Sequence, residues 1–166
     1  MIVMGYPGIG KTTLAKMYHD NDYIDLETSN FYKRPEWYCD YCNVAEDLSR
    51  QGYIVLTGCH KEIREILKDS DELTVLIFPE DKLKEKCIER LRKRAEFNGN
   101  KEKDLRALKR VEEKWEQDHE ELQKIWDECP SIISRVITEE MFDDSEYIKE
   151  LNRNLIRIRK HYERRN

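Results

Sequence analysis

The residues with the clearest chemical meaning lie close to the start of the chain, in the stretch MGYPGIGKTT at positions 4–13. Gly5, Gly10, Lys11 and Thr12 match the pattern GxxxxGK(S/T) at every fixed position. Glycines allow a tight turn whose backbone N–H groups point inward and form an anion-binding hollow at the start of a helix. The lysine can reach the β and γ phosphates of a nucleoside triphosphate, and the threonine hydroxyl can bind the Mg²⁺ that bridges them. We therefore expect ATP and Mg²⁺ to bind at a loop that comprises Gly5, Tyr6, Pro7, Gly8, Ile9, Gly10, Lys11, Thr12 and Thr13.

A second group of reactive side chains follows in the stretch IDLETS. Asp25, Glu27 and Ser29 alternate along the chain and share one face if a strand continues through them. Carboxylates at the carboxyl end of a parallel strand lie where such sheets bind ligands. We expect Asp25 to accept a hydroxyl proton or to hold the metal with Thr12, and Glu27 and Ser29 to contact the substrate. The alternative is a solvated strand end.

Two arginines provide the cations that phosphoryl transfer needs. Arg90 and Arg94 are four residues apart and share a helix face with Leu83 and Cys87. Arginines that close over a phosphate stabilise the charge that develops on its oxygens. We expect residues 79–100 to form a lid that carries both arginines, with a hinge in the sequence NGN at 98–100. The alternative is an ordinary solvated helix surface.

Two further stretches are candidates for binding a phosphate acceptor. The segment 30–43, NFYKRPEWYCDYCN, has five aromatic residues and no helical or strand period, so we expect a loop that stacks on a base. Lys33 and Arg34 are then placed to meet a phosphate. His60, Lys61 and Arg64 follow a strand and are expected to bind the acceptor. The alternatives are a packed surface loop and solvated residues at the start of a helix.

The secondary-structure pattern predicts a single α/β domain over residues 1–166. Short apolar runs alternate with helical periodicity, which implies crossover connections and a mainly parallel sheet. The apolar runs are continuous, as expected for strands buried on both faces. The expected strands are 1–4, 22–29, 53–57, 73–78 and 131–137, and the expected helices are 11–20, 43–52, 61–69, 81–97, 103–128 and 145–162.

Composition narrows the class of protein. Of the 166 residues, 39% are charged and 39% hydrophobic, and the net charge of −5 argues against a generally basic nucleic-acid coat. The chain has no apolar run of about 20 residues that would span a membrane and no secretory leader, so we expect a cytoplasmic protein. Five cysteines are then reduced thiols. Cys39 and Cys42 form a CxxC pair near Cys59, but the set of zinc ligands is incomplete.

The order of these motifs resembles the P-loop kinases of the nucleoside monophosphate kinase and shikimate kinase group, including phage-encoded nucleotide-kinase-like proteins. The resemblance covers roughly residues 1–98, and more loosely the last strand and helix; only the glycine loop is highly specific. It implies a P-loop fold with a five-stranded parallel sheet, MgATP as phosphate donor and a lid that brings arginines to the γ-phosphate. In this resemblance Lys11 and Thr12 match the loop, Asp25 the acidic strand end, and Arg90 and Arg94 the lid.

The chain also departs from that group. Such kinases often have an aspartate after the third strand, where this chain has Thr57, and the Gly-Phe-Pro-Arg substrate signature is replaced by the region of His60. We expect a kinase that transfers the γ-phosphate of ATP to a small nucleotide or nucleoside. One alternative is a polynucleotide 5′-end kinase, which the basic terminal helix would suit; another is a switch that binds nucleotide without transfer. The basic residues of that helix are Arg157, Arg159, Lys160, Arg164 and Arg165.

Overall fold

The sheet has five strands, all parallel, in the computed structural model, which describes residues 1–32 and 34–164. The strand order is β2-β3-β1-β4-β5, with β1 in the centre. This arrangement confirms the expected α/β architecture with a five-stranded parallel sheet. Lys33, which was expected to meet a phosphate, and Arg165, a basic residue of the terminal helix, lie outside the described residues. The strands are β1 (Ile2–Gly5), β2 (Tyr23–Asp25), β3 (Ile54–Thr57), β4 (Thr74–Pro79) and β5 (Ile132–Ile137).

Burial on both faces explains the composition of the central strands. Every residue of β1, β3 and β4 is buried, in agreement with their continuous apolar sequences. Met4 of β1 pairs with Thr57 of β3, and Gly5 pairs with Ile77 of β4. In β2, Asp25 pairs with Leu56. The carboxyl ends of β1, β2 and β3 therefore meet at one edge of the sheet.

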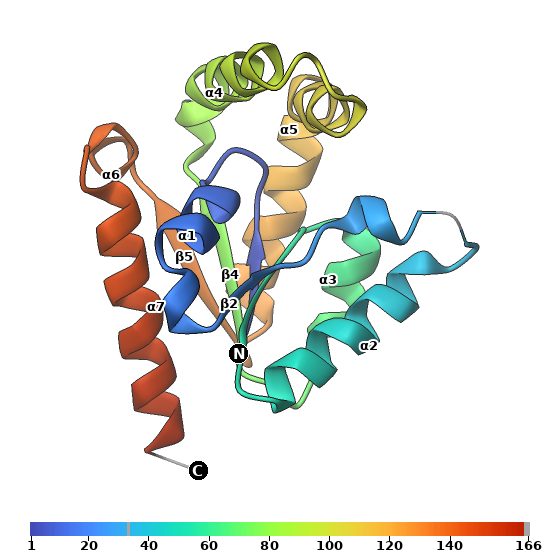
Figure 1. Ribbon diagram of the computed structural model, residues 1–166, viewed down its shortest axis with the longest axis vertical. Helices are drawn as coiled ribbons and strands as arrows, with labels where there is room; N and C mark the ends of the chain where they lie inside the picture. Colours follow the sequence, from blue (N-terminus) through green and yellow to red (C-terminus); the bar gives the residue numbers. More distant parts are fainter. Residues whose placement is uncertain (33, 165–166) are drawn as a thin grey trace.

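Helices cover the sheet and also extend above this edge (Figure 1). Helix α1 lies beside α7, and α2 lies beside α3. Helix α4 packs against α5, and both rise over the carboxyl ends of the strands. None of the helices in the described ranges is long and apolar enough to cross a membrane. The helices are α1 (Lys11–Met17), α2 (Trp37–Arg50), α3 (Lys61–Leu67), α4 (Lys84–Phe97), α5 (Glu102–Glu128), α6 (Glu139–Asp143) and α7 (Tyr147–Glu163).

The longest helix, α5, contributes to the core. Val111, Trp115, Leu122 and Ile125 are all buried, so the apolar stripe of this helix packs on its own domain. The short helix α6 was not predicted, because five residues are too few to show a helical period.

Two predictions about the region after β2 were wrong. The strand expected at 22–29 ends at Asp25, and Thr28–Asn30 forms a 3₁₀ turn, so Glu27 and Ser29 do not continue a strand face with Asp25. The segment 30–43 is not wholly irregular, because α2 begins at Trp37. One reason is Tyr41, which follows Trp37 by one helical turn and is fully buried.

The Tyr41 hydroxyl ties two loops of the carboxyl edge together. It donates a hydrogen bond to Leu26 O at 2.7 Å and accepts one from Gly58 N at 3.0 Å. These loops follow β2 and β3, so a single side chain fixes the spacing of the two strand ends. Burial raises the pKa of this phenol, which therefore stays protonated and able to donate.

We expect Tyr41→Phe to lower the free energy of unfolding by about 1–3 kcal/mol, because a partly buried carbonyl and a partly buried N–H lose their partner. Tyr38→Phe is the matched control, since no hydrogen bond involves the Tyr38 hydroxyl among the described residues, and it should change stability by less than about 0.5 kcal/mol. Urea denaturation followed by circular dichroism measures both. Equal midpoints for the two variants would contradict the role of Tyr41.

Candidate functional site

The loop between β1 and α1 has a backbone that only glycine suits at several positions. Gly8 and Gly10 have φ angles of 88° and 94°, in the left-handed region. At Gly5 an added Cβ would lie 2.7 Å from Ile9 Cδ1 and from Lys11 Cδ. The Tyr147 hydroxyl of α7 donates to Ile9 O at 2.9 Å and supports the loop from outside. The loop thus has the glycine-dependent turn that the sequence pattern predicts, and α7 holds it in place through Tyr147.

Lys11 points back across this loop. Its Nζ donates to Gly5 O at 2.6 Å and to Tyr6 O at 3.2 Å. No carboxylate of the described residues lies within 4.0 Å of this ammonium group, and burial lowers the pKa of Lys11. A partly desolvated cation that has only carbonyl partners is stabilised when an anion arrives beside it. The loop is therefore suited to an anionic ligand.

Thr12 and Asp25 form the oxygen pair next to Lys11. Thr12 Oγ1 in the first turn of α1 donates to Asp25 Oδ2 at the end of β2, at 2.6 Å. Mg²⁺ prefers oxygen ligands and is commonly held by one or two protein groups together with phosphates and water. The donor set fits Mg²⁺: Thr12 would bind it directly, and Asp25 directly or through water.

A structural zinc site receives no comparable support. Within residues 1–32 and 34–164, no three His, Cys, Asp or Glu side chains gather in a way that could hold a metal ion. Cys39 is exposed on α2, while Cys42 and Cys59 are buried as free thiols.

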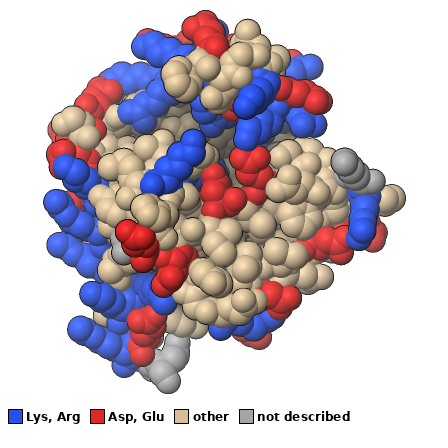
Figure 2. Space-filling model, in the orientation of Figure 1, with Lys and Arg blue, Asp and Glu red and all other residues tan. Residues whose placement is uncertain are grey.

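A cavity of about 1100 Å³ opens from the loop toward α3 and beneath α4 and α5. In Figure 2 this hollow has carboxylates at its centre and lysine and arginine side chains along its upper rim. The structure brings most of the expected site residues to this one cavity. They are Pro7, Gly8, Gly10, Lys11, Thr12, Thr13, Asp25, Glu27, Ser29, His60, Lys61, Arg90 and Arg94.

Arg90 and Arg94 line the cavity, yet each already has a partner in the protein. The Arg90 guanidinium lies 3.4 Å from the centroid of the Phe142 ring and donates to Phe142 O. Arg94 Nε lies 2.8 Å from Asp104 Oδ1 of α5. Both arginines are thus placed on the expected helix face, and each uses part of its guanidinium on a protein partner.

Tyr32 and His60 line the cavity, and Trp37 packs against both of them. The ring centroids of Tyr32 and Trp37 are 4.6 Å apart, and those of Trp37 and His60 are 5.8 Å apart. The Arg106 guanidinium lies 5.1 Å above the Tyr32 ring. Burial, reinforced by the charge of Arg110, lowers the pKa of His60 to about 3. His60 is therefore neutral near pH 7 and can offer a hydrogen bond there but no positive charge.

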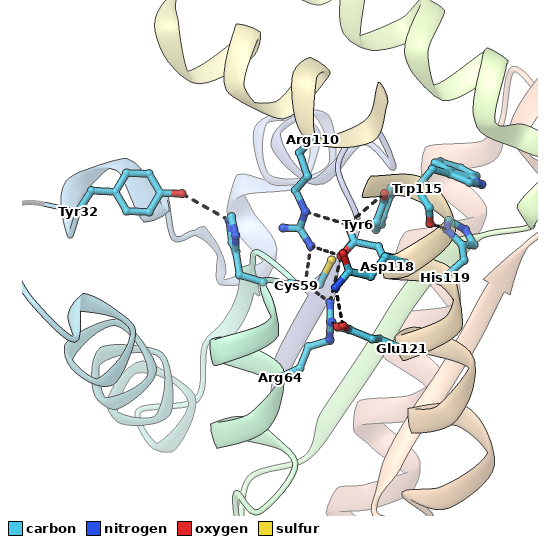
Figure 3. A network of polar contacts seen from close by, with 11 residues as sticks. Tyr6, Tyr32, Cys59, Arg64, Arg110, Trp115, Asp118, His119 and Glu121 are labelled. Carbon is cyan, nitrogen blue, oxygen red and sulfur yellow. Dashed lines mark hydrogen bonds and ion pairs between the residues drawn. The ribbon is translucent and has the colours of Figure 1, made fainter. Parts of the chain in front are cut away.

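Arg64 does not line the cavity, contrary to the expectation that it contacts the acceptor. Its side chain is 1% exposed and lies in a buried ion network beneath the cavity floor (Figure 3). It donates to Cys59 O at 2.6 Å and pairs with Glu121 of α5. Helix α5 covers the face of α3 on which Arg64 lies, and this covering depends on the tertiary fold. Arg34 is exposed, 3.6 Å from Asp40, and also lies outside the cavity lining.

The same network contains functional-site residues that the sequence analysis missed. Arg110 Nε and Nη2 lie 2.9 and 3.1 Å from the two Asp118 oxygens, and Tyr6 in the glycine loop donates to Asp118 at 3.3 Å (Figure 3). A signal existed, because Asp104 and Asp118 fall in register with buried Val111 and Ile125, seven residues apart along α5. Carboxylates on an apolar stripe require buried partners.

No protein-family model matches the chain, and no curated protein matches its sequence.

We expect Arg64→Ala to destabilise the protein by about 3–5 kcal/mol, because Asp118 and Glu121 would lose a buried cation. The matched control is Arg50→Ala on α2, which removes exposed ion pairs worth about 0–1 kcal/mol. Chemical denaturation of both variants provides the comparison. If Arg64→Ala weakened the binding of an acceptor and left the stability unchanged, the structural role of Arg64 would be contradicted and a role in acceptor binding supported.

Proposed function

We propose that this protein is a P-loop kinase that transfers the γ-phosphate of ATP to a nucleotide or nucleoside. The observation that carries the proposal is Lys11, whose ammonium group spans a glycine loop and has carbonyls but no carboxylate as partners among the described residues. The Thr12–Asp25 oxygen pair lies beside it and supplies the metal ligands. A buried cation next to a metal-ligand pair suits a chain of phosphates better than a neutral ligand.

The transfer step uses residues that the cavity brings together. The acceptor hydroxyl attacks the γ phosphorus, the bond from that phosphorus to the β–γ bridging oxygen breaks, and ADP leaves. Asp25 accepts the hydroxyl proton directly or through water. Lys11, Arg90 and Arg94 stabilise the negative charge on the phosphate oxygens. Mg²⁺, when bound, neutralises charge on the β and γ phosphates.

The size and lining of the cavity support a nucleotide or nucleoside as acceptor. Ligand pockets commonly occupy about 300–1000 Å³, and this cavity of about 1100 Å³ leaves room for a second molecule beside ATP. Tyr32 offers an aromatic surface on which a base can stack. Lys61 and Arg106 also line the cavity and supply positive charge for an acceptor that has its own phosphate.

The second candidate is a nucleotide-binding switch without transfer activity. It is favoured by Thr57, which stands where related kinases often have an aspartate and is buried with its hydroxyl 3.4 Å from Val3 O. A threonine at this position supplies no carboxylate for a metal ion. In the kinase proposal Asp25 takes over this role from the neighbouring strand.

We expect ATP and a panel of nucleosides, nucleoside monophosphates and 5′-hydroxyl oligonucleotides to give ADP with at least one acceptor, and Lys11→Ala to lower that turnover by about 10²–10³-fold. Lys124→Ala, an exposed position on α5, is the matched control and should be unaffected. Chromatography of the labelled products measures transfer. Trace ADP formation that is independent of every acceptor would reject the kinase and support the switch.

We also expect Asp25→Asn to lower the transfer rate by about 10² or more, since the amide cannot accept the proton as the carboxylate does. The variant retains the shape of the side chain, so ATP binding should survive. Glu27→Gln is the matched control, because Glu27 lines the same cavity and pairs with Lys103 at 2.6 Å. Single-turnover kinetics separate the two variants, and a larger loss in Glu27→Gln would assign the base to the other carboxylate.

A further inference from the structure

The outer face of α7 has a continuous row of positive charge. Lys149, Arg153, Arg157 and Lys160 are all exposed, at intervals of one helical turn, and we call them the α7 basic row. Figure 2 shows lysine and arginine side chains along the left edge of the molecule, where Figure 1 draws α7 in red. The opposite face of the helix is buried on the domain through Tyr147, Leu151 and Leu155, so the row points into solvent.

The local charge contrasts with that of the whole chain. The chain has a net charge of −5, but α7 has five lysine and arginine residues and two glutamates. Lys149 and Arg153 have glutamate partners within one turn, Glu146 and Glu150, in exposed pairs of little energetic weight. Arg157 and Lys160 have no carboxylate within 4.0 Å in the part of the chain that the structure describes. The row is therefore ready to bind a polyanion.

A surface depression lies beside the α7 basic row and shares several of its cations. A depression of about 560 Å³ lies between α7 and the turn that follows α1. Arg153, Arg157, Arg159 and Lys160 contribute four cations to its lining, and Asp20 and Asp22 at the opposite edge contribute two carboxylates. Asp20 already contacts His19, with Oδ1 3.1 Å from His19 Nε2. Two of the four cations are paired, Arg153 with Glu150 and Arg159 with Glu163, so Arg157 and Lys160 are the ones left for a ligand. The arginine guanidinium is suited to phosphate oxygens.

We propose that the α7 basic row binds the phosphate backbone of a single nucleic-acid strand. From Lys149 to Lys160 the helix rises about 17 Å at about 1.5 Å per residue. A strand stacked as in B-form DNA places one phosphate per about 3.4 Å of axis, so in that geometry this length faces about five phosphates, and fewer in a more extended strand. A membrane surface fits less well, because a helix lying on a bilayer inserts its apolar face, and that face of α7 is buried on the domain.

The position of α7 connects this surface with the proposed active site. Tyr147, in the first turn of α7, contacts the glycine loop through Ile9 O. Ile148 lies close enough to Gly10 that an added Cβ there would be 2.6 Å from Ile148 Cδ1. A strand held along α7 therefore has one end beside the large cavity. The inference does not rest on the proposed kinase activity, because the row takes no part in ATP binding.

The test is fluorescence anisotropy with a labelled 20-nucleotide single strand at 50 and 200 mM salt. With four phosphate contacts the logarithm of the binding constant should fall with the logarithm of salt with a slope of about −3, a loss on the order of 50-fold over this range. Arg153→Gln/Arg157→Gln/Lys160→Gln should reduce the slope by about 2 and the affinity at 50 mM by at least about 10-fold. Arg153→Lys/Arg157→Lys should retain most of the binding.

The matched control is Arg50→Gln/Lys93→Gln/Lys124→Gln, which removes three exposed cations from other helices and should bind like the natural chain. Lys11→Ala should also bind normally, which separates this surface from the nucleotide site. Absence of binding at 50 mM would overturn the proposal, as would equal losses in the two triple variants. Equal competition by polyglutamate or by phosphatidylserine vesicles would likewise overturn it, since neither is a nucleic-acid backbone.

Discussion

The positive charge of Lys11 is the constraint on which the geometry of the site depends. Its ammonium group is partly buried and is held by two carbonyl oxygens of its own loop, those of Gly5 and Tyr6. Both carbonyls can turn toward one amine only if the loop is tight, which explains the left-handed backbone of Gly8 and Gly10. Tyr147 and Tyr6 then fix the outer and inner sides of the loop through α7 and α5. The energy that arranges this cation is supplied by folding, before any ligand is bound.

The parallel sheet converts that local arrangement into a site. Because the strands run in one direction, the ends of β1, β2 and β3 place Gly5, Asp25 and Thr57 along one edge. Asp25 reaches Thr12 only because β2 stops there and the chain turns away. The fully buried strands β1, β3 and β4 carry no charged side chains, so the chemistry lies at Asp25, the last residue of β2, and in the residues that follow the strands.

Local sequence determines some of this site, and long-range packing determines the rest. The conformation of the glycine loop was predictable because its turn requires glycine at fixed positions, and the face shared by Arg90 and Arg94 follows from helical geometry alone. The end of β2 was not predictable from alternation, since Glu27 and Ser29 continue the pattern after the strand has ended. Arg64 was assigned to the acceptor because it lies one turn beyond His60. Only the tertiary fold reveals that α5 covers it with Asp118 and Glu121.

Arg90 and Arg94 have partners of different chemical kinds in the protein. Arg94 is paired with Asp104, which is 3% exposed and also accepts a hydrogen bond from Asn98 Nδ2 at 2.9 Å, so moving Arg94 alone would leave a buried carboxylate with one partner fewer. Arg90, in contrast, has a carbonyl and an aromatic ring as partners, which impose a smaller electrostatic cost when it leaves. The two arginines therefore differ in what binds them: Arg90 has neutral partners, whereas Arg94 can bind a phosphate through its terminal nitrogens while its Nε remains on Asp104. Lys103, one residue before Asp104, pairs with Glu27 at 2.6 Å, so the start of α5 is tied both to the arginine helix and to the loop that follows β2.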